Sequence, residues 1–281
     1  IGLGEHLWES GNPEGAKRAW RKLRKLGRAP GAGDLLYAEV LADHRLHEDA
    51  RAAFEAALAA GPENVACLEA AARWYAAQGA VSDREQAMDL WLRLLDLGRN
   101  AKTNPRAAAR RHGARKQLLL LWKRSGVLNA RLKELASRTA GAKPDLSAGL
   151  LLSHLRLHLG RIEEAQRGVA DLAKRFPDHL ELLHLQVDLA VKAQQLPRAI
   201  ALLQRIATLD SSGASDALHQ AAQLAKAIED HETALELMES ALTLRPEDPR
   251  GQARVGELRL GLGDRERAAS AWREALRMNP R

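Results

Sequence analysis

Small and bulky apolar residues recur along the chain in one fixed frame. An Ala is followed four residues later by a bulky apolar residue and three further on by a small or aliphatic residue, and in several copies Pro comes five residues after that. Positions four and three apart share one face of a helix, so each copy predicts an amphipathic helix. The last copy holds Ala268, Trp272, Ala275 and Pro280. The copies begin at Ala16, Ala50, Ala87, Ala165, Ala199, Ala234 and Ala268.

The spacing of these copies predicts a repeat protein. Neighbouring alanines are mostly 34 or 35 residues apart, whereas Ala87 and Ala165 are separated by 78, which holds two repeats with extra residues. A further helical stretch precedes each alanine and often ends at a Gly. We therefore expect an all-α solenoid of about eight helix pairs with an irregular fourth repeat. Its parts are residues 1–98 for repeats one to three, 99–143 for the irregular basic repeat and 144–281 for repeats five to eight, in one continuous solenoid.

Each repeat is expected to contain two helices joined by a short turn. Gly followed by Asp, as at Gly263 and Asp264, ends one helix and caps the next. Pro197 suits the first turn of a helix, where a missing N–H is tolerated. The expected helices are a partial first helix with 14–27, then 34–44 and 48–60, 65–78 and 83–97, 105–124 and 127–138, 146–159 and 162–175, 180–193 and 197–209, 215–228 and 231–244, and 250–262 and 265–278.

This frame resembles the tetratricopeptide repeat family over nearly the whole chain. In the first helix of one pair, Tyr37, Ala38 and Leu41 form the packing set of that family. Arg156 and Gln186 stand where the family usually has apolar residues, so looser packing is expected there. The resemblance implies a concave surface, formed by the first helices, that binds a protein or peptide. The Lys and Asn set with which chaperone-binding members hold a terminal carboxylate is not matched.

Polar residues of the first helices are the candidates for contact with such a partner. Their charges are mixed in sign, which argues against a surface dedicated to one kind of ion. The candidates are Glu39, Asp43, Arg73, His154, His158, Glu181, His184, Asp188, Lys192, His219, Gln223, Lys226, Arg254 and Glu257.

Basic charge is concentrated in one segment. The chain has a formal net charge of +7, but eleven basic residues and no Asp or Glu lie between Arg99 and Lys133. A helix there could bind an acidic protein surface, an anionic polysaccharide or lipid headgroups, or it could simply be solvated. Trp122 is the one aromatic residue nearby, which argues against single-stranded nucleic acid. The basic patch consists of Arg106, Arg110, Arg111, Arg115 and Lys116.

The histidines raise the question of a metal site. His154 and His158 are four residues apart on one helix and share a face, and His184 and His219 occupy similar places on the next two first helices. Neighbouring helices stand about 8 to 10 Å apart, and no Glu lies between the first two histidines as in a metalloprotease helix. We therefore interpret them as groove or surface imidazoles, which could make an interface sensitive to pH.

Catalytic signatures are missing from the sequence. There is no Gly-rich phosphate loop before a helix, no nucleophile elbow and no Ser, His and Asp set. The single cysteine, Cys67, excludes an intramolecular disulfide and is interpreted as a small buried residue. We therefore predict a non-enzymatic chain without a metal or cofactor.

Six tryptophans account for most of the aromatic residues. Trp20, Trp91 and Trp272 occupy the bulky position of the frame and are expected in the core. Trp8 and Trp74 could instead be contacts in a protein interface, where Trp is enriched, but packing within or between repeats is the favoured interpretation.

Three functions are consistent with these observations. The leading one is a scaffold that binds a partner protein within a larger bacterial assembly. The alternatives are a cell-envelope or polysaccharide-export scaffold whose basic segment contacts an anionic polymer or membrane, and a regulatory module fused to an enzyme outside this sequence. No apolar run approaches the roughly 18 to 20 residues that span a bilayer, so membrane contact is expected only through other segments. The composition suggests a bacterial protein of the periplasm or cytoplasm, and we expect the natural chain to extend beyond Ile1 and Arg281.

Overall fold

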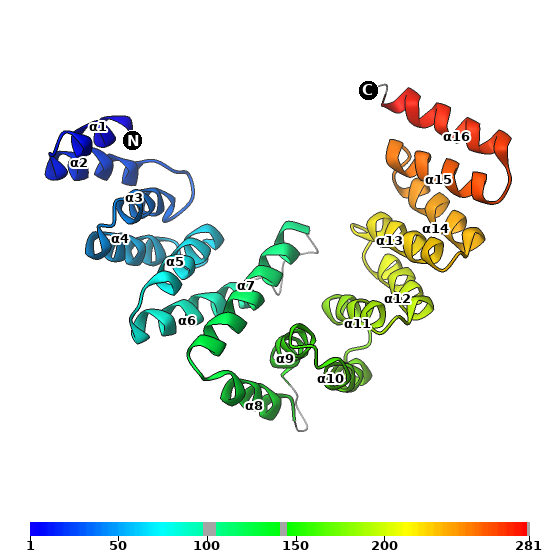
Figure 1. The fold of residues 1–281 in the computed structure, drawn as a ribbon, viewed down its shortest axis with the longest axis horizontal. Helices are drawn as coiled ribbons and strands as arrows, with labels where there is room; N and C mark the ends of the chain where they lie inside the picture. The colour runs from blue at the N-terminus through cyan, green and yellow to red at the C-terminus, as the bar shows by residue number, and fades with distance from the viewer. Residues whose placement is uncertain (98–104, 141–144, 280–281) are drawn as a thin grey trace. The chain divides into compact units, whose positions relative to one another are not determined.

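The structure is a computed structural model that describes residues 1–97, 105–140 and 145–279, with the side chains of 105–109 left out. The described residues are helical and contain no strand, which confirms the all-α class. They form two compact units, residues 1–129 and 130–281. In each unit, successive helices pack as antiparallel pairs (Figure 1). The expected domain boundaries at 98–99 and 143–144 fall outside the described residues.

Unit 1 contains three helix pairs and one further long helix. Its elements are α1 (Gly2–Glu9), α2 (Pro13–Trp20), the 3-10 helix η1 (Arg21–Lys25), α3 (Ala32–Asp43), α4 (His47–Ala60), α5 (Val65–Ala77), α6 (Val81–Leu97) and α7 (Pro105–Arg124).

The second helix of the first pair is shorter than the sequence predicts. An α-helix was expected over 14–27, but α2 ends at Trp20 and continues as η1. The cause is the close approach of α3, because a Cβ on Gly33 would lie 2.3 Å from the carbonyl oxygen of Arg24 and 2.4 Å from that of Leu26. The backbone therefore changes from α-helix to 3-10 helix where it contacts α3 of the next pair.

Unit 2 begins within α8 and continues as four regular helix pairs. Its elements are α8 (Leu128–Thr139), α9 (Leu146–His158), α10 (Ile162–Arg175), α11 (Leu180–Lys192), α12 (Leu196–Leu209), α13 (Ala214–Ala227), α14 (His231–Leu244), α15 (Pro249–Gly261) and α16 (Arg265–Met278).

The helix ends of unit 2 follow the expected local chemistry. Gly263 has a φ of 84°, which a residue with a side chain rarely adopts, and it ends the last first helix. The carboxylate of Asp264 then accepts a hydrogen bond of 3.1 Å from the backbone N–H of Arg267 and caps α16. Pro197 lies in the first turn of α12, as predicted.

The alanine of every copy is completely buried. The alanines at the start of the frame all have 0% exposed surface: Ala16, Ala50, Ala87, Ala165, Ala199, Ala234 and Ala268. A small side chain at this point lets the two helices of a pair pack closely, because it adds little volume between them. The frame read from the sequence is therefore the packing frame of the fold.

Glycine on the first helix complements tryptophan on the second. A Cβ on Gly4 would lie 2.0 Å from Nε1 of Trp20, and a Cβ on Gly256 would lie 2.3 Å from Nε1 of Trp272. Each glycine precedes the alanine of its copy by twelve residues, so the two pairs are equivalent by register. The indole ring therefore packs directly on the backbone of the first helix.

Candidate partner-binding surface

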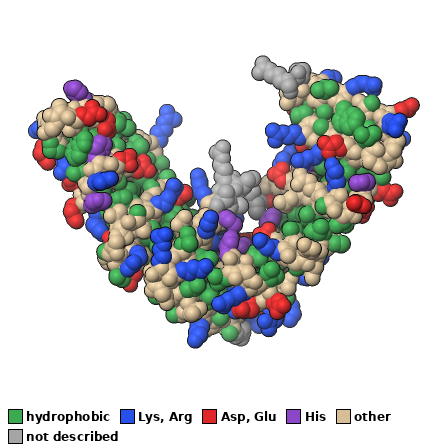
Figure 2. Space-filling model, viewed as in Figure 1, with side chains coloured by type: hydrophobic (Ala, Val, Ile, Leu, Met, Phe, Trp, Pro, Cys, Tyr) green, Lys and Arg blue, Asp and Glu red, His purple; other side chains and the backbone are tan. Residues whose placement is uncertain are grey.

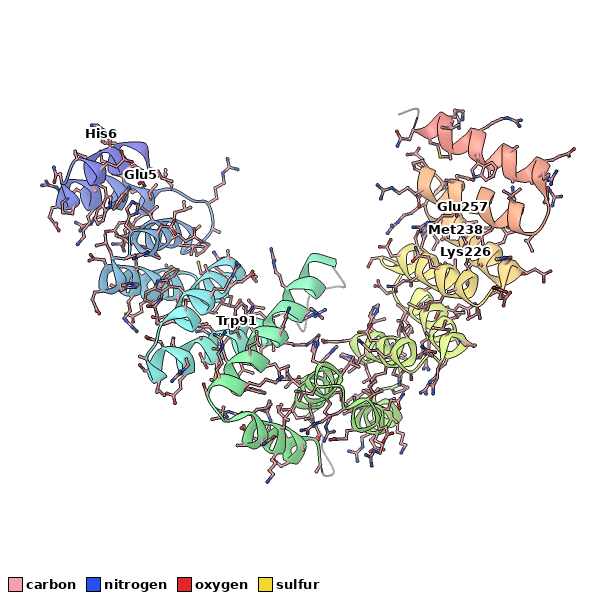
Figure 3. The ribbon with its side chains drawn as sticks, in the orientation of Figure 1. Glu5, His6, Trp91, Lys226, Met238 and Glu257 are labelled. Atoms are coloured by element: carbon pink, nitrogen blue, oxygen red, sulfur yellow. The ribbon has the colours of Figure 1, made fainter. Side chains whose placement is uncertain are left out.

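In unit 2, α13 and α15 present two pairs of polar side chains, here called the α13–α15 quartet: Lys226 with Glu257, which Figure 3 labels, and Gln223 with Arg254. Nζ of Lys226 lies 2.8 Å from a carboxylate oxygen of Glu257, and both side chains are about half exposed, at 50% and 54%. With its amide oxygen turned toward the guanidinium, Gln223 accepts hydrogen bonds of 2.9 Å and 3.1 Å from Arg254. The structure thus brings together four residues that the sequence analysis named separately.

His219 also connects these two helices. Its Nδ1 lies 2.8 Å from the backbone carbonyl oxygen of Ser215, so this nitrogen donates its proton. Nε2 lies 3.1 Å from a carboxylate oxygen of Asp248. Sequence analysis placed His219 on the candidate surface but missed Asp248. The Asp-Pro pair before the helix was the available signal, because that pattern is typical of a helix N-cap.

A smaller cluster occupies α3 and α5 of unit 1. Burial raises the pKa of the Glu39 carboxyl, the nearby carboxylate of Asp43 raises it further, and Arg73 acts in the opposite direction. Arg73 also donates a hydrogen bond of 2.7 Å to Glu69, one turn away on the same helix. Three of the candidates therefore interact with one another electrostatically.

The other first-helix candidates lie on α9 and α11. His158, Asp188 and Lys192 are exposed, whereas His154, Glu181 and His184 are partly buried. Within the described part of the chain, no group of three or more His, Cys, Asp or Glu side chains is arranged to hold a metal ion. Figure 2 shows acidic and basic side chains interspersed over the visible surface of each unit rather than sorted by sign.

The basic patch lies on α7 and is uneven in exposure. Arg110 and Lys116 are exposed and Arg111 is half-buried, but only 8% of the surface of Arg115 is exposed. The side chain of Arg106 lies outside the described residues. The apolar residues 118–122 that follow on α7 face the interior of the unit, except for Leu120, which is 39% exposed. The residues available for an anionic partner are therefore fewer than the sequence alone indicates.

Trp8 packs within unit 1. Its ring centroid lies 5.8 Å from that of Trp20 and 5.0 Å from that of His44. The His44 ring is held by the carbonyl oxygen of Val40, 2.8 Å from Nδ1, and by the carboxylate of Glu5, 3.0 Å from Nε2. These contacts join α1, α2 and α3, in line with the packing interpretation.

Trp74 belongs to a second aromatic cluster of unit 1. Its ring centroid lies 5.2 Å from that of Phe54 and 5.0 Å from that of Tyr75. The guanidinium of Arg51 lies 5.7 Å from the Trp74 centroid and pairs at 2.7 Å with the buried Asp83. The positive charge is thus held over the aromatic face, where it is attracted by the ring.

In the part of the chain that the structure describes, no helix combines the length and hydrophobicity needed to cross a membrane.

Solved structures with similar folds were found at low sequence identity. MamA (41-end) from Desulfovibrio magneticus RS-1 is 17% identical, with 60% of this chain and 95% of that chain covered and a TM-score of 0.43. BtubC from P. vanneervenii is 16% identical, with 70% and 91% covered and a TM-score of 0.46. TTC0263, a thermophilic TPR protein in Thermus thermophilus, is 20% identical, with 68% and 92% covered and a TM-score of 0.39.

Family membership rests on the sequence rather than on these structures. No curated protein matches the chain. Two family models, both described as tetratricopeptide repeat, do match, one over residues 1–65 and 150–214 and the other over residues 215–248. Together the matched segments make up more than half of the chain, and they include the buried alanines of five copies. The chain belongs to the tetratricopeptide repeat family.

Proposed function

We propose that this chain is a non-enzymatic scaffold that binds a partner protein or peptide along the face formed by its first helices. The observation that carries the proposal is the α13–α15 quartet. It presents two donors and two acceptors in a fixed arrangement on neighbouring helices, with Lys226 and Glu257 exposed and Arg254 partly buried.

The quartet is better explained by binding than by folding. Exposed ion pairs contribute only about 0.2 to 1 kcal/mol to stability, so the Lys226 and Glu257 pair is not needed to hold α13 against α15. A partner with an acidic group can pair with Lys226 or Arg254, and one with a basic group can pair with Glu257. Because charges of both signs alternate here, the face is suited to a partner segment that also carries both signs.

A charge exchange tests this function. In the Lys226→Glu variant the quartet carries a second negative charge, whereas Lys226→Glu combined with Glu257→Lys keeps the ion pair but reverses its direction. Proteins that co-purify with the full chain from cells of the source organism are compared between the wild type and both variants. We expect a specific partner to be lost from both, because both present a negative charge at position 226 in place of the positive charge of the wild type.

The matched control is the exposed pair Glu274 and Arg277 on α16, with 2.6 Å between its closest N and O atoms. Exchanging these two charges should leave the partner bound. A partner retained by both quartet variants, or lost equally from the α16 control, would contradict binding at the first-helix face.

The basic segment supports a second candidate function, contact with an anionic polymer of the cell envelope. Its eleven positive charges without an acidic residue are the supporting observation. We expect the chain to bind dextran sulfate with an affinity that falls steeply with salt, and the double variant Arg110→Ala and Lys116→Ala to weaken that binding and flatten the salt dependence. Arg18→Ala with Lys22→Ala is the control outside the segment. Equal losses in the two double variants would exclude a specific role for α7.

A further inference from the structure

Unit 2 contains a pocket between α8, α9 and α10, here called the α8–α10 pocket. Its volume is about 780 Å³, within the range of cavities that accept a ligand or an anchoring side chain. Apolar and small residues, including Leu152, Leu172 and Ala136, line its interior. None of the first-helix candidates contributes to it. Its charged residues are Arg156, Glu164, Arg167, Asp171, Lys174 and Arg175.

The pocket exists because two positions are small in this repeat. Ser153 and Gly168 are equivalent, 34 residues earlier, to Val187 and Leu202 of the next repeat. Val187 is buried and Leu202 packs against the same core cluster. The cavity between α10, α11 and α12 measures only about 250 Å³. The repeat frame is therefore kept, while side-chain volume has been removed at one repeat.

A buried hydroxyl group faces this space. Only 1% of the surface of Ser153 is exposed, although this residue lines the pocket. Its Oγ lies 3.4 Å from the place that a Cβ on Gly168 would occupy. The Ser153 hydroxyl is therefore a polar group that the wall of the pocket offers to an occupant. Because a hydroxyl both donates and accepts hydrogen bonds, a ligand that places a polar group beside it gains affinity.

The rim of the pocket is positively charged. Both of its carboxylates are already paired, Glu164 with Nε of Arg156 at 3.3 Å and Asp171 with Nζ of Lys174 at 2.9 Å. Arg167, which is exposed at the rim, adds a positive charge beside the apolar interior. An occupant with an apolar group flanked by negative charge is complementary to this arrangement.

We propose that the α8–α10 pocket binds an apolar side chain presented by an acidic segment of a partner protein. The pocket accommodates the side chain between Leu152 and Leu172, Ser153 forms a hydrogen bond to the segment, and the basic rim pairs with its carboxylates. This site is separate from the first-helix face, so one chain can hold two partners or two parts of one partner.

Selection from a random peptide display library tests the proposal. Peptides are selected on the full wild-type chain and counter-selected on the Gly168→Leu variant, in which leucine fills the pocket as Leu202 does one repeat later. We expect the selected peptides to carry a large apolar residue next to Asp or Glu, and to bind Gly168→Leu at least about tenfold more weakly, as for a buried anchor residue. Ser153→Val should weaken the same peptides, and Arg167→Gln should reduce their preference for acidic residues.

The test separates this site from the first-helix face. Peptides of the α8–α10 pocket should bind the Lys226→Glu variant as tightly as the wild type. Thermal unfolding of Gly168→Leu and Ser153→Val shows whether both remain folded, which we expect because this chain carries the same residues at the equivalent positions. The proposal is overturned if no peptide distinguishes the wild type from Gly168→Leu, or if the selected peptides lack acidic residues. Neither outcome bears on the first-helix face.

Discussion

Replacing Gly256 with alanine measures how closely a first helix packs against the tryptophan of its second helix. The new Cβ would lie 2.3 Å from Nε1 and 2.5 Å from Cδ1 of Trp272, distances that non-bonded atoms do not tolerate. The indole therefore has to move. Its N–H donates a hydrogen bond of 3.1 Å to the carbonyl oxygen of Ala253, and this bond weakens when the ring shifts.

Three opposing effects set the size of the change in the free energy of unfolding. Alanine favours a helix interior over glycine by about 1 kcal/mol, which stabilises the variant. Overpacking costs about 1 to 3 kcal/mol, and loss of the indole hydrogen bond costs about 0.5 to 1.5 kcal/mol. The two costs together exceed the gain, so we expect Gly256→Ala to be less stable by about 1 to 3 kcal/mol.

Thermal unfolding of the full chain, followed by circular dichroism, measures this effect. A loss of this size lowers Tm by about 2 to 4 °C for each kcal/mol in a unit of this length. Gly261→Ala is the control on the same helix, because its new Cβ would make only an ordinary contact of 3.4 Å with His231. We expect its Tm to stay near that of the wild type.

A double variant identifies the indole as the cause. Phenylalanine lacks the N–H-bearing ring of tryptophan. The effects of Gly256→Ala and Trp272→Phe on the free energy of unfolding should therefore couple by about 1 kcal/mol, because Gly256→Ala is less destabilising in the Trp272→Phe background. If Gly256→Ala were as stable as Gly261→Ala, the inference that the indole packs directly on the backbone of α15 would be wrong.

Three further predictions concern the core, a helix cap and the cysteine. Ala165→Leu and Ala234→Leu should each lower the free energy of unfolding by about 1 to 3 kcal/mol through overpacking, since neither alanine is exposed, and unchanged melting temperatures would refute the repeat register. Burial tends to raise the pKa of the Asp145 carboxyl, but the hydrogen bond from the backbone N–H of Ala148 and a neighbouring arginine outweigh this and lower it. The stabilisation by this N-cap is therefore present at neutral pH and is lost as the pH falls through the lowered pKa. Asp145→Ala should lower the free energy of unfolding by about 1 kcal/mol at pH 7 and by progressively less below about pH 4. A loss of stability that does not depend on pH would contradict this. Burial raises the pKa of the Cys67 thiol, which has 0% exposed surface, so it should react with DTNB only as unit 1 opens, and rapid reaction in the native state would contradict its burial.

Helix positions and the repeat frame could be read from the sequence because they depend on interactions between residues close together in the chain. The alanine spacing places apolar residues on one helical face, and caps such as Asp264 act within one turn. The prediction from local pattern was wrong at η1. There the close packing of Gly33 against the carbonyl of Arg24 accompanies the end of an α-helix that the local pattern favoured.

The candidate surface was predictable as a list of residues but not as a set of contacts. By repeat register Glu257 is equivalent to Gln223, which lies one turn from Lys226 on the preceding first helix. That the charges of Lys226 and Glu257 pair at 2.8 Å follows from the distance and rotation between α13 and α15, which depend on the packing beneath them. Asp248 was missed for the same reason, since its contact with His219 spans two helices.

The α8–α10 pocket shows most clearly what periodicity leaves open. Ser153 and Gly168 fit the frame as well as Val187 and Leu202 do, so the order of residues does not distinguish a filled repeat from a hollow one. A cavity is the difference between the space enclosed by three helices and the volume of all the side chains that enter it. That difference is defined only when the helices have packed together.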